Sequence, residues 1–263
     1  MLRTLLTNSR KIVFKFGSST LADSEGRIDL EFFSDFSAQC ASFIKGGKQV
    51  VIVSSGAQAA GLSTMHRLSR KKDIHYRQAL CAVGQVELMA AWQRAFVKHD
   101  LHVAQILLTR EDFGDKNRTL NMRNTLFTLV DEGIIPIINE NDSVCVDEIK
   151  IGDNDTLASQ TAILWSADLL VLFSDIDGLF TKNPTTNSDA KFIETVNNID
   201  IDTLGAKIST EGSGFLGTGG VETKISAAKE SLKFGIPVIL TRGKPAALNA
   251  LCEGNQRGTV FSA

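Results

Sequence analysis

Two lysines in this sequence lie where a cation could meet a bound phosphate. Lys15 ends an apolar stretch and is followed by Gly17 and two serines. Lys224 follows residues 214–223, which hold four glycines and lead into a helical pattern. Glycine lets the backbone approach an anion closely, and backbone N–H groups at a helix start bind phosphate. A lysine in a first helical turn is disfavoured unless an anion lies nearby, so both segments are candidate phosphate sites.

A second group combines carboxylate and amide side chains. Residues 139–142 (NEND) close one apolar run, and residues 152–155 (GDND) open a helical pattern. A turn and a helix cap would each explain one of these segments. Together they supply groups that can hold an ammonium, orient lysines or carry Mg²⁺ through water.

No histidine lies in these four segments. Two lysines, a glycine-rich segment and an acid–amide cluster suit phosphoryl transfer to an acceptor that is already ionised. A carboxylate has an ordinary pKa near about 4.3, so it needs no general base at neutral pH. Positioning and charge neutralisation are then sufficient for catalysis.

The elements that must position these residues follow from alternating apolar runs and helical patterns. Strands separated by helices predict an α/β fold, a three-layer αβα open sandwich with a mainly parallel central sheet. Ligand sites in such sheets lie beyond the carboxyl ends of the strands. An exposed hairpin is expected at residues 144–151. We expect strands at residues 12–16, 49–54, 102–109, 134–139, 168–174 and 236–241, and helices at residues 30–44, 76–99, 119–132, 154–166, 221–234 and 245–252.

Composition and simple sequence patterns disfavour several classes of function. The 28 basic and 30 acidic residues of this 263-residue chain give a net charge of −2, which disfavours nucleic acid as a partner. Four cysteines without a C-x-x-C spacing are typical of reduced, buried thiols. No apolar run approaches the ~18 residues of a membrane span, and no signal peptide is recognisable, so a cytoplasmic protein is expected. Residues 212–217 match G-x-G-x-x-G but follow a polar segment rather than a buried strand, so no dinucleotide site is predicted there.

Eight segments in order along the chain, from about residue 11 to 260, resemble the amino-acid kinase family, and most closely its members that phosphorylate L-glutamate. They are residues 15–19 (KFGSS), 53–57 (VSSGA), 82–85 (AVGQ), 108–110 (LTR), 138–142 (INEND), 152–155 (GDND), 174–179 (SDIDGL) and 217–224 (GTGGVETK). The resemblance implies one kinase domain over residues 1–263. Its amino-acid-binding lobe would span about residues 1–165 and its nucleotide-binding lobe about residues 166–263.

The implied reaction is transfer of a phosphoryl group from MgATP to the γ-carboxylate of L-glutamate, the first step of proline synthesis. Carried over from the family, Lys15 and Lys224 bracket the transferring group and Asp155 orients them. Mg²⁺ is expected to arrive with ATP, and no protein ligands for a metal are assigned. The implied glutamate-binding residues are Ser55, Asp142 and Asn154, with Asp153 beside them. The implied nucleotide-binding residues are Lys15, Ser174, Asp175, Thr218, Gly219, Gly220, Val221, Glu222, Thr223 and Lys224.

Some features depart from the family pattern. Val221 stands where methionine is frequent, and Ser174 where threonine is common. Many members continue into a C-terminal RNA-binding-like (PUA) domain, whereas this sequence ends soon after residues 258–261, so no role of that domain is expected. Feedback by proline and assembly into a homo-oligomer, a dimer or tetramer, are further family expectations.

Alternatives within and outside this family remain open at the level of sequence. Aspartokinases share a start similar to residues 15–19 but normally carry regulatory domains, for which this sequence has no room. Acetylglutamate and isopentenyl phosphate kinases have His-Gly-Gly-Gly where this chain has residues 54–56 (SSG). A non-catalytic amino-acid-binding protein is disfavoured because both lysines and Asp155 are present. ADP release with glutamate, with aspartate and without an amino acid distinguishes these alternatives.

Overall fold

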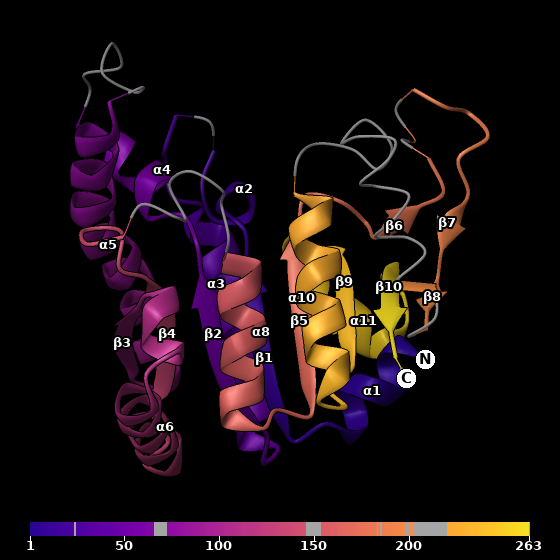
Figure 1. Cartoon of the computed structure of the whole chain (residues 1–263), viewed down its shortest axis with the longest axis horizontal. Coiled ribbons are helices and arrows are strands. Elements are labelled where there is room, and N and C mark those ends of the chain that lie inside the picture. Colours follow the sequence, from indigo (N-terminus) through magenta and orange to yellow (C-terminus); the bar gives the residue numbers. More distant parts are fainter. Residues whose placement is uncertain are drawn as a thin grey trace.

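The structure is a computed structural model that describes residues 1–23, 25–65, 73–145, 154–182, 184, 186–197, 200–201 and 220–262. Its centre is a sheet with the strand order β3-β4-β2-β1-β5-β9-β10-β8 (Figure 1). Strands β3 to β9 in this order run parallel to one another, and β10 is antiparallel to β9. The predicted mainly parallel sheet is therefore confirmed. The strands are β1 (Lys11–Phe16), β2 (Gln49–Ser54), β3 (Val103–Leu108), β4 (Ile135–Glu140), β5 (Leu169–Ser174), β8 (Thr195–Val196), β9 (Val238–Arg242) and β10 (Gly258–Phe261).

Alternate residues of the strands enter two separate cores. Phe14 and Phe16 of β1 belong to one apolar cluster, and Val13 belongs to the other. The first cluster is covered by α1 (Leu2–Asn8), α3 (Leu30–Lys45), α5 (Ile74–Phe96) and α11 (Ala247–Glu253). The second is covered by α6 (Lys116–Asp131), α8 (Asn154–Trp165) and α10 (Val221–Lys233). Helices thus cover both faces of the sheet, and the predicted three-layer αβα sandwich is confirmed (Figure 1).

Aromatic rings hold β1 at the centre of the sheet. The ring of Phe16 stacks on Phe173 of β5 at 5.0 Å between centroids and meets Phe36 of α3 edge-on at 4.7 Å. Trp92 of α5 lies against the same ring at 5.7 Å. Burying a side chain of this size contributes about 1.5–3 kcal/mol. This packing fixes the carboxyl end of β1, where Lys15 lies.

Lys15 interrupts an otherwise apolar strand. It is in register with Val53 of β2 and Leu172 of β5, both members of the cluster that α8 and α10 cover. Because side chains alternate across a strand, Lys15 points to the same face as Val13. Its side chain is only 5% exposed, so a buried cation faces the first turns of α8 and α10.

The observed helices begin and end close to the predicted ones, and the differences have local causes. The Asp73 carboxylate accepts hydrogen bonds from the N–H groups of His75 and Tyr76, so α5 begins before the predicted residue 76. Its last predicted turn is a 3₁₀ helix, Val97–His99. Asp115 accepts from Arg118 N and starts α6 three residues early.

Several short elements lacked a sequence signal. They cover too few residues to show a helical or strand period. The hairpin predicted at residues 144–151 lies outside the described residues from residue 146 onward. No helix in the described part of the chain is long and apolar enough to cross a bilayer. The unpredicted elements are α1, α2 (Ser18–Leu21), α4 (Ala57–Leu62), the 3₁₀ helix Arg110–Phe113, β6 (Leu179–Phe180), β7 (Phe192–Ile193), β8 and β10.

Candidate active site

The candidate site lies where strands end and helices begin. Strands β1, β2, β4 and β5 are parallel, so their carboxyl ends meet at one edge of the sheet. The first turns of α8 and α10 reach the same edge (Figure 1). The sequence therefore brings side chains from distant segments to one place, as expected for an α/β sheet.

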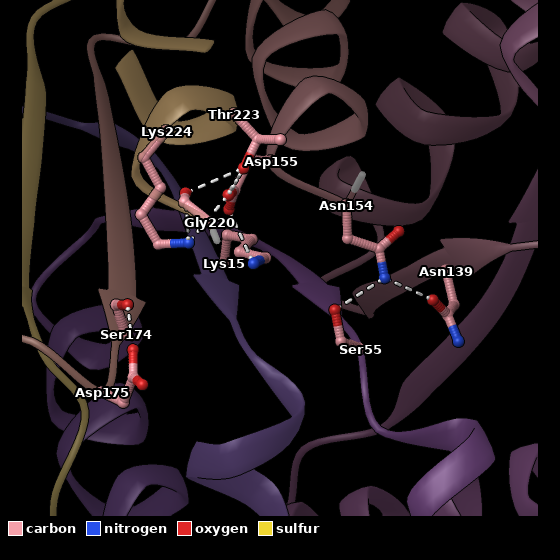
Figure 2. A network of polar contacts seen from close by, with 10 residues as sticks. All are labelled: Lys15, Ser55, Asn139, Asn154, Asp155, Ser174, Asp175, Gly220, Thr223 and Lys224. Atoms are coloured by element: carbon pink, nitrogen blue, oxygen red, sulfur yellow. Dashed lines mark hydrogen bonds and ion pairs between the residues drawn. The ribbon is translucent and has the colours of Figure 1, made fainter. Parts of the chain in front are cut away.

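A buried carboxylate joins the two lysines. Lys15 Nζ lies 2.6 Å from Asp155 Oδ1, and Lys224 Nζ lies 3.0 Å from Asp155 Oδ2. The side chain of Asp155 is 1% exposed and that of Lys224 is 12% exposed. Figure 2 shows both ammonium groups converging on this carboxylate. The three residues predicted to be catalytic are thus in direct contact.

The charge state of Asp155 follows from these contacts. Burial by itself would raise the pKa of Asp155, but the positive charges of Lys15 and Lys224 outweigh burial and hold that pKa below its ordinary value. Hydrogen bonds from Lys15 and Thr223 act in the same direction. The carboxylate is therefore ionised at neutral pH, and the trio carries one net positive charge in a buried place.

The first turn of α10 closes this cluster. Lys224 Nζ donates to Gly220 O at 3.0 Å, and the Thr223 hydroxyl lies 2.8 Å from Asp155 Oδ2 and 2.9 Å from Gly220 O. The anion that a lysine in a first helical turn requires is therefore the Asp155 carboxylate. Val221 is buried in the apolar core beneath, and Glu222 is exposed.

A chain of amide side chains lies beside the ion pairs. Asn154 Nδ2 donates to Ser55 Oγ and to Asn139 Oδ1, each at 2.8 Å (Figure 2). Asn139 Nδ2 donates to Gln85 Oε1 at 2.8 Å. All four residues are buried. Asn154 Oδ1 has no hydrogen-bond partner within the described residues, so one buried acceptor of this chain is left unsatisfied.

Asp142 supplies a second unsatisfied acceptor. Its side chain is buried, and its Oδ1 has no hydrogen-bond partner in the part of the chain that the structure describes. Burial is the main cause that raises the pKa of Asp142 to about 6. A hydrogen bond from Cys81 opposes that increase, and the negative charge of Glu140 adds to it. A carboxylate held in this way gains from a cationic partner.

Some of the remaining predicted site residues lie in the part of the chain that the structure describes, and others lie outside it. The Ser174 hydroxyl donates to Asp175 Oδ1 at 3.0 Å at the end of β5 (Figure 2). No hydrogen bond or ion pair between described residues joins Asp142, Ser174 or Asp175 to either lysine. The predicted Asp153, Thr218 and Gly219 lie outside the described residues, as does the rejected G-x-G-x-x-G segment.

Sequence reasoning assigned no role to Gln85 or to the contact it makes. Gln85 belongs to one of the eight matching segments, and a glutamine in line with the apolar positions of a predicted helix is the available signal. Its partner Asn139 was predicted only as part of the acid–amide cluster. No group of three or more His, Cys, Asp or Glu side chains suited to a metal occurs among the described residues.

Two lysines that share one buried carboxylate form a positively charged cluster at the edge of the parallel sheet. The sequence pattern of the amino acid kinase family matches residues 10–242, and the chain belongs to this family. Its similarity to glutamate 5-kinases extends over its whole length. The glutamate 5-kinase of Alkaliphilus metalliredigens (strain QYMF) is 53% identical over 264 residues, which cover 100% of this chain and 99% of that protein. The glutamate 5-kinase of Treponema pallidum (strain Nichols) is 40% identical over 294 residues, covering 99% of each.

Solved structures share the fold. The carbamate kinase from Giardia lamblia bound to AMP-PNP superposes with a TM-score of 0.66 at 15% identity, covering 97% of this chain and 99% of that one. The UMP kinase from Ureaplasma parvum gives a TM-score of 0.65 at 15% identity, covering 97% and 100%. The predicted resemblance to the amino-acid kinases, and to those that act on glutamate, is confirmed.

Proposed function

We propose that this chain transfers the γ-phosphoryl group of ATP to the γ-carboxylate of L-glutamate, yielding L-glutamyl 5-phosphate and ADP. The observation that carries the proposal is the convergence of Lys15 and Lys224 on the buried Asp155, beside the Ser55–Asn154 pair. Full-length similarity to glutamate 5-kinases supports the choice of acceptor.

In this reaction a γ-carboxylate oxygen forms a bond to the γ-phosphorus while the bond to the bridging β-phosphate oxygen breaks. ADP departs with the electron pair. The Lys15 and Lys224 ammonium groups neutralise the charge on the transferring group and on the leaving oxygen. Asp155 holds both lysines in place before ATP binds, so little reorganisation is needed during transfer.

The proposed glutamate site matches the two charges of an amino-acid head group. Ser55 Oγ accepts a hydrogen bond from Asn154, so its own proton can be donated to the α-carboxylate. The unsatisfied oxygens of Asn154 and Asp142 can accept from the α-ammonium. Asp153, adjacent to Asn154 in sequence, completes this set in our proposal.

The proposed nucleotide site uses the other half of the chain. Ser174 and Asp175 at the end of β5, together with residues 218–224, would hold ATP. The binding lobes would then be about residues 1–165 for the amino acid and about 166–263 for the nucleotide. Mg²⁺ would enter on the phosphates of ATP and supply further neutralisation of their charge.

The proposal extends to inhibition by proline and to the cellular location of the protein. Proline carries a carboxylate and an ammonium as glutamate does, so the same head-group site could bind it as a feedback inhibitor. A cytoplasmic location is supported by the thiols, because no disulfide joins the four cysteines, all of which the structure describes.

The experiment that tests the proposal measures ADP release with glutamate, with aspartate and without an amino acid. Hydroxylamine is included, because an acyl phosphate reacts with it to give a hydroxamate, whereas a phosphate ester does not. We expect ADP release that depends on glutamate, with one hydroxamate formed per ADP. A preference for aspartate would assign the chain to another acceptor. Glutamate binding without any ADP release would identify a non-catalytic amino-acid-binding protein.

A further inference from the structure

Helix α5 presents a buried glutamine to the end of β4. Gln85 is 8% exposed, and its Oε1 accepts the hydrogen bond from Asn139 Nδ2. The helix comes this close to its surroundings because the preceding residue is Gly84. A Cβ at that position would lie 1.8 Å from Ala57 O of α4. One helical segment therefore combines a close backbone contact with a buried hydrogen bond to the site.

The direction of each hydrogen bond in the amide chain is fixed by one backbone group. The N–H of Glu140 donates to Asn139 Oδ1 at 2.9 Å, and a backbone N–H can only donate. Oδ1 of Asn139 is therefore the acceptor, and its Nδ2 faces Gln85. Gln85 must then present its carbonyl oxygen, which leaves Gln85 Nε2 without a partner among the described residues.

The same direction continues to the proposed substrate site. Because Asn139 Oδ1 is an acceptor, the group that Asn154 turns toward it must be its NH₂. The second proton of that NH₂ goes to Ser55 Oγ. The carbonyl oxygen of Asn154 is thereby turned away from Asn139, without a partner in the described structure. Because Ser55 Oγ accepts from Asn154, its own proton can be donated to another group.

We propose that Gln85 is a positioning residue for the amino-acid substrate. The N–H of Glu140 sets the orientation of the Asn139 amide, and Gln85 Oε1 stabilises that orientation by accepting from its Nδ2. In this orientation Asn154 presents its oxygen, and Ser55 its proton, to the substrate head group. This inference rests on the proposed function, because it assigns the head group of glutamate to Ser55 and Asn154. Gln85 acts through Asn139, so its contribution concerns glutamate and not ATP.

The test compares two substitutions that differ in one acceptor. Gln85→Met keeps the approximate size of the side chain and removes the carbonyl oxygen. Gln85→Glu keeps an acceptor oxygen at the same distance from the backbone. Loss of one hydrogen bond in the chain is expected to raise KM for glutamate about 5–10-fold in Gln85→Met. KM for MgATP should stay within about twofold of wild type, and Gln85→Glu should recover most of the loss. Gln93→Met, on an exposed position of the same helix, is the matched control.

Further readouts separate positioning from general damage. Thermal unfolding and circular dichroism report whether each variant folds, and Gln85→Asn, which is one methylene shorter, replaces Gln85→Met with the same expectation if the latter does not fold. A folded variant with an unchanged KM for glutamate overturns the inference, as does an equal rise in both KM values. Wild-type protein without glutamate-dependent ADP release would instead refute the proposed function.

Discussion

Asp155 carries one negative charge between two positive ones. Burying ions is costly unless they are paired, and the Lys15–Asp155–Lys224 trio leaves one positive charge unmatched. An anionic ligand supplies the missing charge. In the proposed function the phosphates of ATP supply this charge, so the same three side chains would bind the phosphates and take part in the transfer.

Replacing Lys224 tests its part in transfer. We expect Lys224→Ala to lower kcat about 10²–10³-fold, the effect of losing one preorganised charge at a transition state. The Kd for glutamate, measured by calorimetry, should change little, because Lys224 contacts Asp155 and Gly220 and not the amide chain. Lys233→Ala is the control, because Lys233 lies at the end of the same helix in an exposed pair with Glu230. A Lys224→Ala enzyme with half of the wild-type kcat would remove this residue from the mechanism.

Asp142 makes the unliganded protein less stable as the pH rises. Its folded pKa of about 6 lies above the ordinary 3.8, so the folded state retains a proton that the unfolded state has released. The stability linked to that proton is lost as the pH rises through about 6. Asp142→Asn removes the titration, and its stability advantage over wild type should grow by about 2 kcal/mol between roughly pH 4 and 7.5. Urea unfolding at both pH values measures this difference.

The expected gain in stability comes with a loss of function. The amide introduced by Asp142→Asn lacks the negative charge proposed to meet the glutamate ammonium, so this enzyme should show a higher KM for glutamate and an unchanged KM for MgATP. A stability difference that stays constant across the pH range would contradict the raised pKa. A rise in KM for MgATP alone would contradict the assignment of Asp142 to glutamate.

At the scale of elements, α4 and α5 meet backbone to backbone. A Cβ at Gly61 would lie 2.0 Å from Leu80 O, and a Cβ at Gly84 would lie 1.8 Å from Ala57 O. This contact brings two side chains of α5 to neighbouring strand ends. Gln85 meets Asn139 of β4, and Trp92 Nε1 donates to Ser54 Oγ of β2 at 3.0 Å.

Adding one methyl group at this contact should displace the helix. We expect Gly84→Ala to destabilise the protein by about 1–3 kcal/mol, because no flexible side chain can move out of the way. KM for glutamate should rise as well, because Gln85 moves with the helix. Gly114→Ala is the matched control, since its Cβ would lie 3.4 Å from Glu111 O at a negative φ. Chemical denaturation and glutamate kinetics are the measurements, and wild-type values of both for Gly84→Ala would refute the close contact.

At the scale of the whole molecule, turnover at saturating substrate should depend little on pH. The acceptor carboxylate ionises near about 4.3, and Asp155 stays ionised because its pKa is lowered. We therefore expect kcat to be nearly flat from about pH 6.5 to 8.5. The ratio kcat/KM for glutamate should fall below about pH 6, where Asp142 gains its proton.

One pH profile would contradict transfer to a carboxylate. A kcat that rises tenfold per pH unit up to a pKa near about 7, with chemistry rate-limiting, would require a general base. A hydroxyl acceptor would then replace the carboxylate acceptor.

Much of this molecule could be predicted from sequence because its central strands are long apolar runs. Such runs predict β1, β2 and β5 almost to the residue, and the order of strands and helices then brings Lys15, near the end of β1, to the edge of the sheet where α8 begins with Asp155 in its first turn. The six residues of α4 are too few to show a period. The link from Gln85 to Asn139 joins residues 54 positions apart, and it depends on the direction in which an amide is turned. Neither the short helix α4 nor this hydrogen bond produces a pattern that can be recognised in the sequence.

The position of β1 has a consequence for synthesis on the ribosome. This strand leaves the ribosome early, and β2 can pair with one of its edges after Gln49 is made. Its other edge pairs with β5, which begins only at Leu169. At roughly 5–20 residues per second, that edge stays unpaired for on the order of ten seconds. During this time the nascent chain displays an open strand edge, the kind of surface that pairs with other chains, because α3 and α5 cover a face of this strand and not that edge.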